Sequence, residues 1–80
     1  MLPRVTQVTA KDNYLLNILF SNGEKREFSV KPYLDYPVYK SLQEKTFFNS
    51  VYTQNGTVCW GENDIDFDPD TLYIESVVVD

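Results

Sequence analysis

Five carboxylates in the last quarter of the sequence have the spacing of a calcium-binding loop. Aspartate fills the first, third, fifth and seventh places and glutamate the twelfth, which are ligand positions of an EF-hand. These residues are Asp64, Asp66, Asp68, Asp70 and Glu75. The sixth place needs glycine for a sharp turn, but here it is Pro69, and the intervening Ile65 and Phe67 are suited to a core. We therefore predict no metal, and instead a strand with an acidic outer face that leads into a capped helix.

The same carboxylates raise the question of acid–base catalysis. Alternate residues of a strand lie about 6.6–6.8 Å apart, a separation that suits the carboxylate pair of a glycosidase. Exposed carboxylates, however, have no burial that would raise the pKa of one partner. The chain has no histidine and one cysteine, which excludes Ser–His and Cys–His nucleophilic pairs and Cys/His zinc sites. We predict that the chain is not an enzyme and uses no cofactor.

Charge is divided unequally along the chain. Residues 1–45 hold all seven Lys and Arg with five Asp and Glu, whereas residues 46–80 hold seven Asp and Glu and no Lys or Arg. This acidic half disfavours nucleic acid, since phosphate contacts need Lys and Arg. It suits a basic protein partner, or else it is a solvated surface that keeps a small protein in solution.

Aromatic residues supply a second candidate surface, because Tyr and Trp anchor many interfaces. We expect Trp60 to be a core residue, and one or more of Tyr33, Tyr36 and Tyr39 to be partly exposed at an interface. The candidate partner-binding residues are Glu62, Asp64, Asp66, Asp70, Tyr33 and Tyr36.

Two further features are interpreted as structural. Four cations between positions 25 and 40 make only a weak nucleic-acid signal: Lys25, Arg26, Lys31 and Lys40. The single cysteine, Cys59, has no neighbouring cation or base that would activate its thiol.

Period-two patterns predict most of the elements that must position these residues. Strands are expected at 4–10 and 14–20, and a further strand carries Phe28. A three-residue loop at 21–23 would set Leu16 opposite Phe28 on one buried face, whereas a two-residue loop would expose Phe28. A second hairpin is expected at 50–54 and 57–60 about a two-residue Asn55-Gly56 turn.

The remaining segments predict short helices and a small last element. Pro37, with Val38 and Leu42 four residues apart, indicates a helix at about 37–44, after which Phe47 or Phe48 returns to the core. Residues 64–67 should be extended, and Asp68 should cap a helix that runs to 75 or 76. The tail 77–80 is either a last strand or a packed terminus.

Together these elements predict a single α+β domain over residues 1–80, with a mostly antiparallel sheet of about five strands and two short helices on one face. The N-terminus lacks the apolar segment of a secretory signal, and the longest run without a charge is too polar to span a membrane. With one cysteine, a cytoplasmic location is expected.

Several short segments, in their order and spacing, are similar to the bacterial and phage family called domain of unknown function 2442. They are Asn22–Glu24, Phe28, Val30–Leu34, Pro37–Val38, Thr57–Trp60, Asp64–Asp66 and Asp68–Tyr73. The resemblance implies a small α+β fold. Some relatives carry an added helix-turn-helix domain, which these 80 residues lack, and others accompany small partners suggestive of toxin–antitoxin pairs. The family has no assigned catalytic residues, so the resemblance implies no site.

From the sequence we expect a non-catalytic protein–protein interaction or regulatory accessory module, toxin–antitoxin-like or phage-associated. Two alternatives stay open: a nucleic-acid-binding accessory domain, and a binder of a metal or small ligand. No pattern in the sequence indicates which partner is bound or which oligomeric state the protein adopts.

Overall fold

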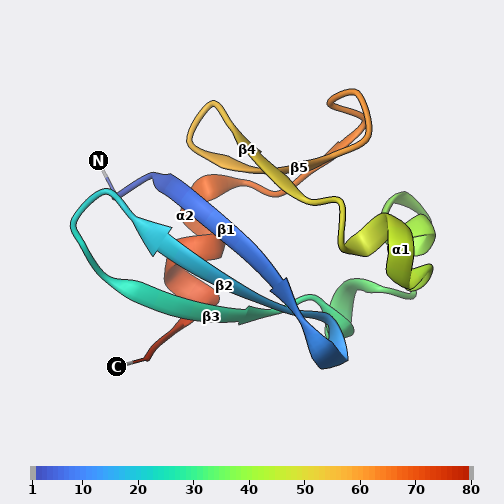
Figure 1. The fold of residues 1–80 in the computed structure, drawn as a ribbon, viewed down its shortest axis with the longest axis horizontal. Coiled ribbons are helices and arrows are strands. Elements are labelled where there is room, and N and C mark those ends of the chain that lie inside the picture. The colour runs from blue at the N-terminus through green and yellow to red at the C-terminus, as the bar shows by residue number, and fades with distance from the viewer. Residues whose placement is uncertain (1, 80) are drawn as a thin grey trace.

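The computed structural model describes residues 2–79 (Figure 1) and contains a four-stranded antiparallel sheet. Strands β1 (Val5–Lys11), β2 (Leu15–Phe20) and β3 (Lys25–Ser29) follow one another along the chain. Strand β7 (Val77–Val78) then pairs with β3, which gives the order β1-β2-β3-β7. Residues 77 and 78 of the predicted tail therefore form a last strand, one of the two outcomes that the sequence left open, and Asp80 lies outside the described residues.

The first hairpin has the register that burial requires. The backbone N–H of Phe20 donates to the carbonyl of Glu24 at 2.9 Å, and Leu16 pairs with Phe28. Gly23 closes the three-residue loop with φ +88°, a left-handed conformation that glycine adopts without steric cost. The predicted three-residue loop is confirmed.

A second, smaller sheet has the order β4-β5-β6. Its strands are β4 (Tyr52–Gln54), β5 (Thr57–Trp60) and β6 (Ile65–Asp66). Asn55 and Gly56 both have positive φ, 54° and 78°, as a type I′ turn requires, so the predicted two-residue turn is also confirmed. The α+β class holds, but the strands are divided between two antiparallel sheets instead of forming one sheet of about five.

Helical segments connect and cover the sheets. Helix α2 (Pro69–Glu75) begins after Asp68, whose side chain accepts a hydrogen bond from the backbone N–H of Thr71 at 3.0 Å, as predicted. Helix α1 (Lys45–Phe48) is a single turn. Three 3-10 helices complete the set: η1 (Asp12–Tyr14), η2 (Lys31–Tyr33) and η3 (Pro37–Gln43).

The 3-10 geometry of η3 changes the buried face that the sequence suggested. An i, i+4 pairing of Val38 with Leu42 presumed an α-helix, but a 3-10 helix repeats every three residues. Leu42 is fully buried and Tyr39 is half-buried, whereas Val38 is 60% exposed. Phe48 rather than Phe47 is fully inserted in the core.

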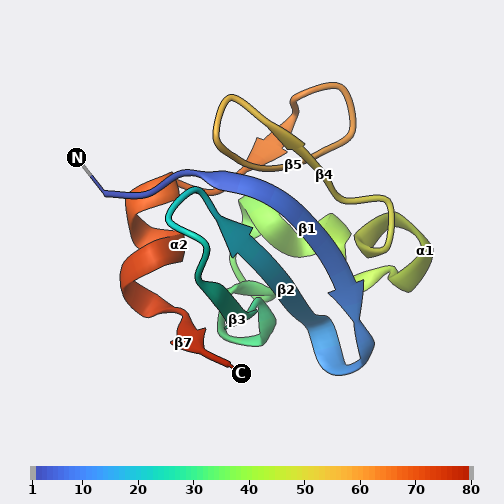
Figure 2. The same cartoon turned by 60° about the vertical axis from the view of Figure 1, so that its left-hand side comes forward.

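The core lies between the inner face of the four-stranded sheet, α2 and the smaller sheet. Figure 2 shows α2 on one side of β1, β2 and β3, and the β4–β5 hairpin beside β1. The backbone N–H of Val5 joins the two parts by donating to the carbonyl of Gly56 at 2.9 Å. No helix within residues 2–79 is long and apolar enough to cross a membrane. The core residues are Val5, Leu16, Ile18, Phe20, Phe28, Val30, Leu34, Leu42, Phe48, Val58, Trp60, Ile65, Phe67 and Leu72.

Candidate functional site

Tyrosine rings gather over Phe67, the buried residue that links β6 to α2. The ring of Tyr39 stacks on Phe67 with centroids 4.5 Å apart and an interplanar angle of 2°. Tyr33 meets the same ring edge-on at 5.2 Å. Tyr36 lies edge-on to Tyr33 at 6.1 Å and is 55% exposed. Two of these rings are thus anchored by the core, and the third projects beyond them.

Carboxylates border these rings. The hydroxyl of Tyr33 donates to Oε1 of Glu75 at 2.8 Å, and the hydroxyl of Tyr39 donates to the backbone carbonyl of Asp66 at 3.4 Å. Burial and the nearby Asp66 carboxylate raise the pKa of Tyr39. We call this the tyrosine–acid surface, and its residues are Tyr33, Tyr36, Tyr39, Asp66 and Glu75.

The fold therefore joins two candidates that the sequence treated separately. Tyr33 and Tyr36 come from the segment after β3, and Asp66 from β6, yet they share one surface. In the sequence, Glu75 stands out only as the twelfth position of the calcium-like pattern that begins at Asp64. Its contact with Tyr33 spans 42 positions, so no local spacing could have shown it.

The hydroxyl of Tyr33 should make the fold sensitive to alkali. Burial, and then the hydrogen bond and negative charge of Glu75, raise the pKa of this phenol from 10 to about 12. A raised folded-state pKa gives stability that is complete below pH 10 and is lost as the pH rises towards 12. In alkaline denaturation followed by circular dichroism, Tyr33→Phe should reduce the decrease in stability between pH 10 and 12. Tyr52→Phe serves as the control. Equal slopes in parent and Tyr33→Phe would contradict the assignment.

Glu62 and Asp64 lie in the turn between β5 and β6. The carboxylate of Asp64 accepts the backbone N–H of Glu62 at 3.3 Å. The hydroxyl of Tyr52 accepts the N–H of Asn63 at 3.1 Å and donates to the carbonyl of Gly61 at 2.8 Å. Both acidic side chains are exposed. The turn therefore carries two negative charges on a backbone that these hydrogen bonds hold in place.

The other members of the calcium-like string have separate contacts. Asp68 caps α2, and Asp70 forms an ion pair with Arg4 at 3.2 Å. Glu75 accepts the hydroxyl of Tyr33. Within residues 2–79, no three Asp, Glu, His or Cys side chains converge as a metal site would require.

The remaining candidates have mainly structural contacts. Trp60 is fully buried, as predicted, and its Nε1–H donates to the carbonyl of Phe48 at 2.8 Å. Cys59 is buried, and that burial, together with Asp66, raises the pKa of its thiol, which opposes thiolate formation. Arg26 does not contribute to the suggested basic patch, because its guanidinium binds Glu24 and two backbone carbonyls near the end of α2.

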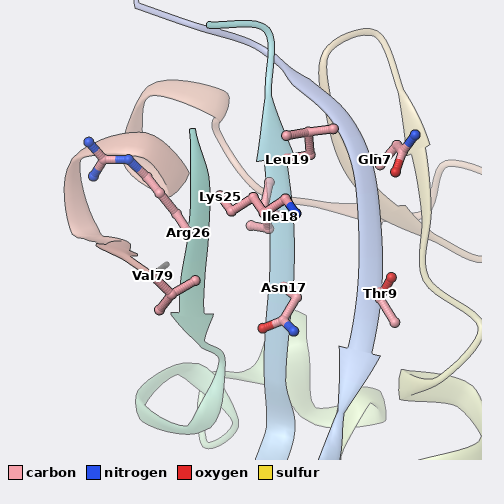
Figure 3. A pocket seen from close by; sticks show the side chains of 8 residues that line it. All are labelled: Gln7, Thr9, Asn17, Ile18, Leu19, Lys25, Arg26 and Val79. Carbon is pink, nitrogen blue, oxygen red and sulfur yellow. The ribbon is translucent and has the colours of Figure 1, made fainter. Parts of the chain in front are cut away.

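Two shallow hollows are present in the described part of the chain. The larger, about 260 Å³, lies on the outer face of the four-stranded sheet (Figure 3), and the smaller, about 130 Å³, lies beside η1 and α1. Both are smaller than the pockets of about 300–1,000 Å³ that hold small ligands. The larger is lined by Gln7, Thr9, Asn17, Ile18, Leu19, Lys25, Arg26 and Val79.

Comparison with known proteins agrees with the resemblance seen in the sequence. Residues 5–77 match the family model described as Protein of unknown function (DUF2442). No curated protein and no solved structure matches the chain. Because the family model covers nearly the full length, from the start of β1 to β7, the chain belongs to the DUF2442 family.

Proposed function

We propose that this protein is a non-catalytic interaction module whose tyrosine–acid surface, with the neighbouring β5–β6 turn, binds a basic protein partner. The observation that carries the proposal is that exposed Glu75 and Asp66 lie beside anchored tyrosine rings, Glu75 through its carboxylate bound to Tyr33 and Asp66 through its backbone carbonyl bound to Tyr39. Arg and Lys bind carboxylates through charge-assisted hydrogen bonds and also lie over aromatic faces.

The charge balance of this half supports the same partner. Residues 46–79 contribute six carboxylates and no Lys or Arg. Among the ion pairs of the described residues, only Arg4–Asp70 involves one of these six. The other five carboxylates thus keep a negative potential that accelerates encounter with a positive surface.

A non-enzymatic role is supported by the same contacts. Catalytic acids and bases are positioned in a cleft that perturbs the pKa of one of them. Asp66 instead lies on an exposed strand, while Asp68, Asp70 and Glu75 bind groups of the fold itself. Tyr39 stacks on Phe67, and Tyr33 contacts the same ring edge-on, so both rings are held by the core.

Binding to the native partner, identified by pull-down, should weaken with salt and with loss of two exposed carboxylates. Screening shortens the reach of charge to about 8 Å at physiological ionic strength and about 3 Å at 1 M salt. Asp64→Asn with Asp66→Asn should cost about 0.2–1 kcal/mol of binding free energy per lost pair, measured by calorimetry at low and high salt.

The matched control is Asp12→Asn, which removes an exposed carboxylate from the β1–β2 connection. It should leave the affinity unchanged, and all variants should keep the parent melting temperature. Binding that is insensitive to salt and to the double substitution would mean that the acidic half serves only solubility.

A further inference from the structure

Strand β7 is an edge strand with apolar side chains on both of its faces. Val77 is 66% exposed, Val78 50% and Val79 36%. Val78 pairs with Arg26, whose side chain points toward α2, so Val77 and Val79 lie on the opposite, outer face. Ile74 of α2 is also 67% exposed. Apolar residues on both faces are typical of a strand whose two faces are both covered, whereas all three valines here are exposed.

The backbone of this edge has one residue turned outward. The N–H of Val79 donates to the carbonyl of Lys25 at 2.8 Å. Bonding direction alternates along an antiparallel strand, so the N–H and carbonyl of Val78 point away from β3. Natural edges are commonly protected by Lys, Pro or a bulge, and residues 77–79 contain none of these protections.

We propose that β7 pairs antiparallel with β7 of a second copy of this chain, about a two-fold axis at Val78. In that register the N–H of each Val78 donates to the carbonyl of the other, and Val77 of one copy lies opposite Val79 of the other. An isologous contact of this kind is self-complementary and closes after two copies. The two four-stranded sheets then become one continuous sheet.

The charged residues beside this edge are complementary to those of a second copy, although the whole chains, each of net charge −5, repel one another. Lys25 lies beside Val79, and Glu27 beside Val77, on β3. Across the proposed axis, each outer-face row begins with Lys25 of one copy and ends with Glu27 of the other, with two valines between them. Opposite charges therefore flank the apolar centre in both rows. Strand β1, the other edge of this sheet, is less available, because Val5 already bonds to Gly56.

A three-residue edge buries less area than a stable interface of about 1,200–2,000 Å², so the dimer should be in exchange with monomer. Sedimentation of the full chain over a dilution series should show a concentration-dependent dimer. Both copies carry a net charge of −5, so added salt should strengthen this association. That is opposite to the salt effect expected for the basic partner, so failure of one proposal leaves the other testable.

Val78→Pro removes the outward N–H while leaving the inward bond of Val79, and proline is tolerated on edge strands at such positions. It should raise the dimer Kd about ten- to a hundredfold, with the monomer melting temperature nearly unchanged. Val77→Lys with Val79→Lys keeps every backbone donor and should give the same loss.

Val38→Lys is the matched control, since Val38 is equally exposed on η3, and it should dimerise as the parent does. A parent that stays monomeric at every concentration and salt level would overturn the proposal. So would a dimer that survives both the proline and the double-lysine variants, because the contact would then lie elsewhere.

Discussion

Replacement of Trp60 by alanine should lower the free energy of unfolding by about 3–5 kcal/mol, as for other large-to-small changes in a core. Trp60 is fully buried on β5, and its ring lies 6.0 Å from those of both Phe48 and Phe67. Its indole N–H also satisfies the carbonyl of Phe48. The change therefore leaves a cavity and removes one of two hydrogen bonds to the Phe48 carbonyl, which also accepts the backbone N–H of Val51 at 3.3 Å. Such a loss is a large part of the 5–15 kcal/mol that proteins of ordinary stability possess.

Urea denaturation should be followed by far-ultraviolet circular dichroism, because the substitution removes the one tryptophan whose fluorescence could otherwise report unfolding. Trp60→Phe keeps one aromatic ring in the core, and it removes the N–H donor and the volume of the second ring. We expect it to cost less than the alanine change, because the cavity that it leaves is smaller. A melting point within a degree or two of the parent for Trp60→Ala would instead assign Trp60 to a binding surface.

Both hairpins could be predicted from the sequence because burial and turn chemistry each select a register. Leu16 and Phe28 share a face only with a three-residue loop, and Gly23 supplies the positive φ that such a loop needs. In the second hairpin, Asn55 and Gly56 suit a two-residue turn on their own. The cap at Asp68 follows equally local rules, since its partner is three residues away.

Features that depend on distant contacts were predicted less well. Whether the strands form one sheet or two depends on how the β4–β5 hairpin lies beside β1, which no local pattern specifies. The exposure of Val38 follows from the 3-10 form of η3, where an α-helical spacing had been presumed. The tyrosine–acid surface likewise needs Tyr33 to reach Glu75 across 42 positions. The tyrosines and carboxylates of this surface can be recognised in the sequence, but their contacts form only when distant segments meet in the fold.

Arg26 is a further residue whose role depends on distant contacts. The sequence suggested a basic patch, but in the fold Arg26 connects β3 to α2, and we call this set of contacts the Arg26 tether. Its Nη1 donates to the carbonyls of Tyr73 and Ser76 at 3.1 and 3.2 Å near the end of α2, and the Tyr73 carbonyl also accepts the hydroxyl of Ser76 at 3.0 Å. Its Nε donates to Glu24 at 2.9 Å. The guanidinium carbon also lies 4.0 Å from the centre of the Tyr73 ring. One side chain thus joins β3 to α2 just before β7.

Arg26→Ala should therefore lower the free energy of unfolding by about 2–3 kcal/mol, since three hydrogen bonds donated by a charged group are lost. Arg26→Lys keeps the charge without the planar fork and should cost an intermediate amount. Lys25→Ala removes an exposed neighbouring cation and should change stability by less than about 0.5 kcal/mol. Urea denaturation of the three variants gives this ranking directly.

The pH dependence provides an independent readout of the same tether. Hydrogen bonds from Tyr73 and then Arg26 lower the pKa of Glu24 below 4.5. A lowered folded-state pKa gives stability that is present above pH 4.5 and is lost as the pH falls through the folded-state value. Removing Arg26 should weaken this acid-side loss, and Glu24→Gln should remove most of it. If Arg26→Ala unfolds with the parent's midpoint and the parent's acid sensitivity, then α2 and β7 are held in place by apolar packing alone.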